Sequence, residues 1–94
     1  MNKKKLQIEQ LESKMKHFSK LATVVSPPTG WVRATRLALG MSHQQMAKKL
    51  KISRQSVQEL EQREKEGAIT IKSLSEAAKA LNMKLVYGFV PLDG

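Results

Sequence analysis

Four neighbouring side chains in residues 54–59 carry the hydrogen-bonding groups needed to read the edges of DNA bases. An arginine can donate two hydrogen bonds to guanine O6 and N7, and a glutamine can bond adenine N6 and N7. A carboxylate can accept a hydrogen bond from the N4 amine of cytosine. This short segment supplies all three types, and the candidate base-reading residues are Arg54, Gln55, Gln58 and Glu59.

A second group of side chains suits contacts with phosphate that do not depend on base sequence. Hydroxyl, amide, imidazole and ammonium groups donate hydrogen bonds to phosphate oxygens, and lysines also attract phosphate by charge. Each lysine is equally well explained as part of a solvated helix face. The candidates are His43, Gln44, Lys48, Lys51, Ser53, Ser56 and Lys65.

The charge of the chain favours a polyanionic partner. Its 94 residues include 17 Lys and Arg against 8 Asp and Glu, which gives a net charge of +9. The excess of positive charge is concentrated in the first two thirds of the sequence. A basic surface of this kind most often binds nucleic acid and less often an anionic membrane.

The same composition argues against an enzyme, a metal protein and a membrane-spanning protein. The chain has no cysteine and only two, widely separated histidines, so we expect no disulfide and no metal site. It shows no nucleophile beside a base and no glycine-rich phosphate loop, so we expect no catalysis and no cofactor. Neither a bilayer-spanning apolar run nor a secretory pattern is present, and we expect a soluble cytoplasmic protein.

Helical periodicity and capping residues place the candidate side chains on two short helices, at 43–50 and 54–65. Ser42 with Gln45 forms a capping box for the first helix, and Ser53 caps the second. This is the pattern of a helix-turn-helix, in which one helix lies across the DNA backbone and the second enters the major groove. The side chains predicted to face inward are Met46, Ala47, Leu50, Val57 and Leu60.

Two further helices are predicted, at 31–39 and 71–81, with Thr29 and Thr70 as caps. Trp31 is interpreted as a core anchor near the linker. The pattern as a whole divides the chain into an N-terminal amphipathic helix (1–25), a proline linker (26–30), a helix-turn-helix domain (31–82) and a C-terminal dimerisation strand (83–94).

The two terminal segments suggest contacts with other proteins. The N-terminal helix is expected to pack on the domain or on a dimer partner, and a membrane-surface helix is the alternative. Residues 84–91 alternate like a strand, and a single strand in a helical protein needs a partner for its backbone groups. We predict that this strand pairs with its copy in a homodimer; the alternative is addition to the sheet edge of a partner protein. The covered residues would be Leu85, Tyr87 and Phe89.

The segment "RLALGMSHQQMAKKLKISRQSVQELEQRE" resembles the lambda-repressor-like, Xre-type DNA-binding domains. The stretches "PPTGWVRATRLALGMS", "EKEGAITIKSL" and "LNMKLVYGFVP" resemble a narrower group, the mobile mystery protein A regulators. These occur beside a Fic-domain protein, which implies a toxin–antitoxin-like pair. The expected fold is an all-α, lambda-repressor-like helix-turn-helix domain of five helices with an extra C-terminal β-strand.

The resemblance also implies roles for particular residues. Arg54 and Gln55 open the helix that reads base edges in this family, and Glu59 lies one turn further along the same face. His43 replaces a glutamine that usually contacts phosphate, and a histidine can still donate a hydrogen bond there. Arg36 and Glu61 match an ion pair that ties helix 31–39 to the reading helix. The turn position usually held by glycine is Lys51, where a left-handed backbone would cost roughly 1 kcal/mol more than with glycine.

Two hypotheses on function follow. The first is a sequence-specific transcriptional regulator, an autorepressor that binds an inverted-repeat operator in double-stranded DNA as a dimer. The alternative is an antitoxin-like module that inhibits a neighbouring Fic-domain toxin through its N-terminal helix. RNA binding is a weaker third interpretation, because the chain has few aromatic residues on which bases could stack.

Overall fold

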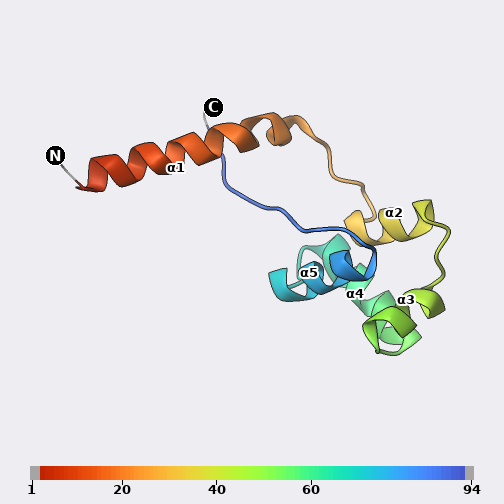
Figure 1. The fold of residues 1–94 in the computed structure, drawn as a ribbon. Coiled ribbons are helices and arrows are strands. Elements are labelled where there is room, and N and C mark those ends of the chain that lie inside the picture. The colour runs from red at the N-terminus through yellow and green to blue at the C-terminus, as the bar shows by residue number, and fades with distance from the viewer. Residues whose placement is uncertain (1–2, 93–94) are drawn as a thin grey trace. The chain divides into compact units, whose positions relative to one another are not determined.

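The computed structural model describes residues 3–92, and within that range all regular structure is helical. Five α-helices and one short 3-10 helix form, close to the predicted positions (Figure 1). The predicted all-α class and the four helices of the central domain are confirmed, with ends that differ by one residue at most. The elements are α1 (Lys3–Ser19), η1 (Lys20–Thr23), α2 (Trp31–Ala38), α3 (His43–Leu50), α4 (Arg54–Glu66) and α5 (Ile71–Ala80).

The chain forms two compact units. One unit is Ser26–Leu85, which contains α2 to α5; the described part of the other comprises residues 3–25 and 86–92. The helices of the described chain fall short of the length and apolar character that a membrane span requires.

The core of the Ser26–Leu85 unit lies where α3 meets α4 and α5 (Figure 1). The predicted inward-facing residues are confirmed: Met46, Ala47 and Val57 are fully buried, Leu60 is nearly so, and Leu50 packs at the edge. Val32 of α2 joins them, together with Ala77 and Leu81 at the end of α5. This packing fixes the crossing of α3 and α4, since each buried side chain of the size of Leu or Met contributes roughly 1.5–3 kcal/mol.

Three of the predicted helix caps are confirmed. The Ser42 hydroxyl accepts from the Gln45 backbone N–H at 3.1 Å, while the Gln45 side chain accepts from the Ser42 N–H at 2.8 Å, which completes the capping box. The hydroxyls of Ser53 and Thr70 accept in the same way at the starts of α4 and α5. These bonds satisfy backbone donors that a helix leaves unpaired at its first turn.

The cap of α2 differs from the prediction. Its N-cap residue is Gly30, at φ 93°, in place of Thr29, and no side chain at the cap position bonds the first turn. The acceptor comes from 33 residues further along the chain: the Glu64 carboxylate accepts from the Trp31 N–H at 2.7 Å and from the Val32 N–H at 2.9 Å. The interpretation of Trp31 as a core anchor is also wrong, because its side chain is 50% exposed.

Lys51 occupies the left-handed conformation that the turn between α3 and α4 requires. Its backbone angles are φ 57° and ψ 42°, and its N–H bonds the last turn of α3. A residue with a Cβ is strained there by roughly 1 kcal/mol relative to glycine. The tight turn is therefore kept at a local cost in stability.

The strand predicted at 84–91 is not seen in the single chain: residues 3–92 contain no β-strand. Alternating side chains favour a strand only where a second backbone supplies hydrogen-bond partners, and the described chain supplies none. Gly88 instead lies against the Phe18 ring, where an added Cβ would stand 2.9 Å from two ring carbons. The dimerisation role of Leu85, Tyr87 and Phe89 stays a prediction, because it depends on pairing with a second copy of the chain.

In the unit formed by the two termini, α1 is an exposed helix. The predicted amphipathic helix ends at Ser19 and continues as the 3-10 turn η1. Its apolar side chains Leu6, Ile8 and Leu11 are exposed, whereas Met15 and Phe18 are half-buried. The apolar stripe that the sequence indicates is thus present and largely uncovered within the described chain.

Candidate nucleic-acid interface

The exposed face of α4 carries the predicted base-reading residues. Arg54, Gln55, Gln58 and Glu59 are all exposed, while Val57 and Leu60 on the other side of the helix are buried in the core. Because the buried side is held against α3, the exposed side is presented in a fixed orientation. Four polar side chains with both donors and acceptors therefore stand on a rigid helix, as base readout requires.

Glu59 is paired within this face. One of its oxygens accepts from the Gln55 side-chain amide at 3.4 Å, and the other lies 3.7 Å from a guanidinium nitrogen of Arg63. The described structure therefore brings Glu59 together with Gln55 rather than with Arg54. Both contacts are exposed and weak, but the first limits the orientation of an amide that is a candidate for contacting a base.

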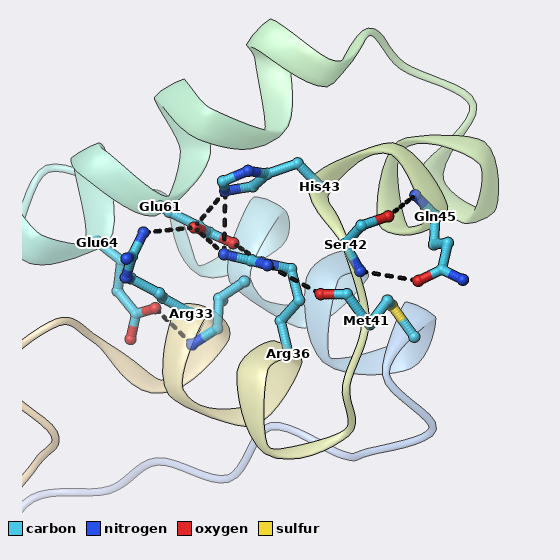
Figure 2. A network of polar contacts seen from close by, with 9 residues as sticks. Arg33, Arg36, Met41, Ser42, His43, Gln45, Glu61 and Glu64 are labelled. Carbon is cyan, nitrogen blue, oxygen red and sulfur yellow. Dashed lines mark hydrogen bonds and ion pairs between the residues drawn. The ribbon is translucent and has the colours of Figure 1, made fainter.

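A buried ion pair joins α2 to α4. Arg36 and Glu61 are 3% and 5% exposed, and the guanidinium donates to both carboxylate oxygens, from Nε at 2.6 Å and from Nη2 at 3.2 Å (Figure 2). Arg36 Nη1 also donates to the Met41 carbonyl at 2.9 Å. This two-point geometry fixes both side chains, and removal of one partner from such a buried pair costs about 3–5 kcal/mol.

The surroundings of Glu61 favour its charged form. Burial acts to raise the pKa of this carboxyl, but hydrogen bonds from Arg36 and His43 and the positive charge beside it act in the opposite direction, and the net result is a pKa below the ordinary value of 4.5. Glu61 is thus an anion at neutral pH, and it offsets the charge of Arg36. A further guanidinium, that of Arg33, lies 3.9 Å from Glu61 at the exposed rim.

His43 completes this network from the start of α3. Its Nε2 lies 3.0 Å from Glu61 Oε1 and 3.0 Å from Arg36 Nη2 (Figure 2). The side chain is 21% exposed, so one edge of the ring remains accessible. His43 therefore links three helices, and its position does not exclude the predicted contact with phosphate.

A surface cavity of about 470 Å³ opens beside the network. It is bordered by α2, α3 and α4, and the residues that line it are all of polar or charged types. Cations from α2 and α4 line it, and its α4 wall begins at Gln58, one of the predicted base-reading residues. Its lining residues are Thr29, Arg33, His43, Gln58, Glu61, Gln62 and Lys65.

The other predicted phosphate-contacting residues are distributed around the helix pair. Ser53 and Ser56 bond each other through their hydroxyls at 2.8 Å at the start of α4. The remaining four are all exposed, and each can reach solvent or a ligand: Gln44, Lys48, Lys51 and Lys65. No cluster of three or more metal-ligating side chains occurs among residues 3–92.

Two residues that matter for this arrangement were not identified from the sequence. No pattern in the sequence singles out Glu64, yet it caps α2. Arg33 was assigned no role, yet it lies beside Glu61 and lines the cavity. The one signal available was spacing: Glu64 follows Glu61 by three positions and so shares its helix face.

Comparison with known proteins gives one match. A family model described as a helix-turn-helix matches residues 32–87, which is more than half of the chain and runs from the second residue of α2 through α5. No curated protein and no solved structure matches. Since the match covers the helix pair, its core and the exposed face of α4, the chain belongs to the Xre/lambda-repressor-like helix-turn-helix family of DNA-binding domains.

Proposed function

We propose that this protein is a sequence-specific transcriptional regulator that inserts α4 into the major groove. The observation that carries the proposal is the exposed set Arg54, Gln55, Gln58 and Glu59 on a helix whose opposite side is buried against α3. Arginine and glutamine at the start of this helix supply two-point contacts to guanine and adenine. The net charge of +9 supplies sequence-independent attraction to the backbone.

The proposal includes binding as a two-fold dimer to an inverted repeat. A single small domain makes few base contacts, and two copies related by a two-fold axis would read half-sites roughly 34 Å apart. Residues 84–91, paired with their copy in the second subunit, are the candidate dimer contact. A selection of bound duplexes from a random pool tests this directly, since it returns an inverted repeat if two copies bind together and a single short site if they do not.

The test of base reading uses substitutions on α4. Arg54→Ala and Gln55→Ala should each lower affinity for the selected duplex by about 1–3 kcal/mol, roughly 5- to 150-fold, and relax preference at the contacted position. Lys48→Ala is the matched control, because loss of a phosphate contact weakens binding to all sequences alike. If Arg54→Ala weakened binding to selected and random duplexes equally, α4 would not be the reading helix.

A second candidate function, an antitoxin-like module that binds a Fic-domain protein, is favoured by the exposed apolar stripe on α1. Ile8 and Leu11 of this stripe are large side chains left in contact with solvent. If a Fic-domain protein is encoded beside this chain, Leu11→Gln should abolish its binding and Arg54→Ala should leave it intact. Gln10→Ala, a neighbouring polar position on α1, is the control; binding that survives Leu11→Gln would contradict this candidate.

A further inference from the structure

Helix α1 has no buried residue within the described chain, although its sequence places apolar side chains on one side. Ile8, Leu11, Met15 and Phe18 follow one another at steps of three and four residues, and so form one stripe along the helix. Ile8 and Leu11 are 56% and 53% exposed. Most of the stability of a helix in a protein comes from the packing of its apolar side. A helix of 17 residues with an uncovered stripe therefore needs a partner surface.

The described chain itself covers the C-terminal end of this stripe. The ring of Phe18 lies against the backbone of Gly88, where an added Cβ would stand 2.9 Å from two ring carbons. Phe18 and the neighbouring Met15 are accordingly half-buried. Leu11 and Ile8 lie about one and two turns closer to the N-terminus and stay exposed. An occupant of the stripe therefore binds its N-terminal half.

The charges beside the exposed half of the stripe favour a second copy of α1 as the occupant. Lys5 and Glu12 are seven residues apart, so both lie along the same edge of the stripe. In a two-fold pair of antiparallel helices, this edge meets the same edge of the other copy. If Ile8 of each copy packs on Leu11 of the other, Lys5 of each copy lies opposite Glu12 of the other. The pair then contains two apolar contacts and two complementary charge pairs.

Other arrangements of the two helices lack this match. A shift of one heptad along the antiparallel pair places Glu12 opposite Glu12 and Lys14 opposite Lys14, and opposed like charges are unfavourable. The same shift also requires Phe18, whose ring already contacts Gly88. Parallel helices place Gln7 opposite Glu12 and form no ion pair at this edge. Charge and covered surface therefore select the same antiparallel register.

We propose that α1 of one copy docks antiparallel on α1 of a second copy, with Lys5 of each copy facing Glu12 of the other. This pairing belongs to the dimer of the proposed function, and it rests on that part of the proposal alone. An isolated pair of strands is marginally stable in water, so a dimer held by residues 84–91 requires a further contact. The two copies of α1 supply it, since α1 lies in the same compact unit as residues 86–92.

Sedimentation equilibrium of the full chain without DNA, at low ionic strength, tests the pairing by charge exchange. Lys5→Glu and Glu12→Lys should each weaken dimerisation about tenfold, because each places two like-charge contacts in the pair. The double variant Lys5→Glu/Glu12→Lys re-forms both charge pairs and should dimerise within about twofold of the wild type. Net charge alone predicts otherwise: the first variant lowers the charge of +9 by two and the second raises it by two, so self-repulsion would change dimerisation in opposite directions.

The apolar contact has its own test. Leu11→Gln should be monomeric at concentrations where the wild type is a dimer, whereas Gln10→Ala, which lies off the stripe, should dimerise like the wild type. A dimer that both charge reversals leave unchanged, or a double variant that does not recover, would overturn the α1 pairing and leave the proposed dimer in place. A monomeric wild type would overturn both, while the role of α4 would still be decided by the DNA affinity of Arg54→Ala.

Discussion

Glu64 should contribute far more to stability than its place at a helix end suggests. Its carboxylate accepts two backbone hydrogen bonds that α2 cannot satisfy itself, from Trp31 at 2.7 Å and from Val32 at 2.9 Å. The Val32 bond is partly buried, and a hydrogen bond to a charged group contributes about 1.5–3 kcal/mol. Water can replace the exposed Trp31 bond, which adds roughly 0.5 kcal/mol. We expect Glu64→Ala to cost about 2 kcal/mol.

For a unit of this size, a loss of about 2 kcal/mol lowers the midpoint of thermal unfolding by roughly 8–16 °C. Circular dichroism measures the global transition. The fluorescence of Trp31, the only tryptophan of the chain, reports on the first turn of α2. Glu66→Ala is the matched control, because Glu66 lies at the same end of α4 and only accepts an exposed bond from Gln62. Equal melting of the Glu64 and Glu66 variants would refute the reasoning.

Gly30 supplies a second test of the same contact. A Cβ at this residue would lie 2.8 Å from both Cδ and Oε1 of Glu64, and the backbone angle φ of 93° is itself unfavourable for other residues. Gly30→Ala should therefore both strain the backbone and displace the carboxylate. Because the two positions share one contact, the double variant Gly30→Ala/Glu64→Ala should lose less stability than the two single losses added together. If the stability losses of the two single variants simply added up in the double variant, Gly30 and Glu64 would not act through the same cap.

Three further predictions concern single positions. Lys51→Gly should raise the free energy of unfolding in urea by about 1 kcal/mol, because glycine adopts the left-handed turn without strain; a decrease would contradict this. The folded-state pKa of Glu61 is lowered, so its contribution to stability is present above pH 4.5 and is lost as the pH falls below that value. The free energy of unfolding in urea should therefore decrease from pH 6 to pH 3.5, and it should decrease less steeply with pH in Glu61→Gln. Glu59→Gln should increase affinity for random duplexes and relax the base preference at the position read by Gln55. If the variant bound every duplex with the same affinity as the wild type, this prediction would be ruled out.

The features that could be predicted from the sequence depend on neighbours a few residues apart. The capping box of Ser42 with Gln45 and the caps by Ser53 and Thr70 are contacts over three residues, so local spacing specifies them. The inward faces of α3 and α4 follow from helical periodicity in the same way. The match of the whole domain to a family then adds the DNA-binding role that periodicity alone does not supply.

The features that could not be predicted depend on residues far apart in the chain. The cap of α2 comes from Glu64, and no spacing rule connects it with Trp31. The alternation in 84–91 forms no strand within the described chain, because strand formation depends on a partner backbone that the pattern does not specify. Trp31 was interpreted as a core anchor near the linker, yet the first turn of α2 leaves its side chain half exposed to solvent.

Three acids of α4 show how a basic domain can use negative charge without losing its affinity for DNA. Glu61 and Glu64 are three residues apart and share the helix face toward α2, where one binds the Arg36 side chain and the other binds the backbone. Both charges are directed into the protein and fix α2 on the reading helix. Glu59 lies two residues before Glu61 and points to the exposed face instead, beside Gln55. Under the proposed function, Glu59 alone of the three would meet DNA, so we expect its negative charge to act on selectivity and the other two to act on the rigidity of the α2–α4 pair.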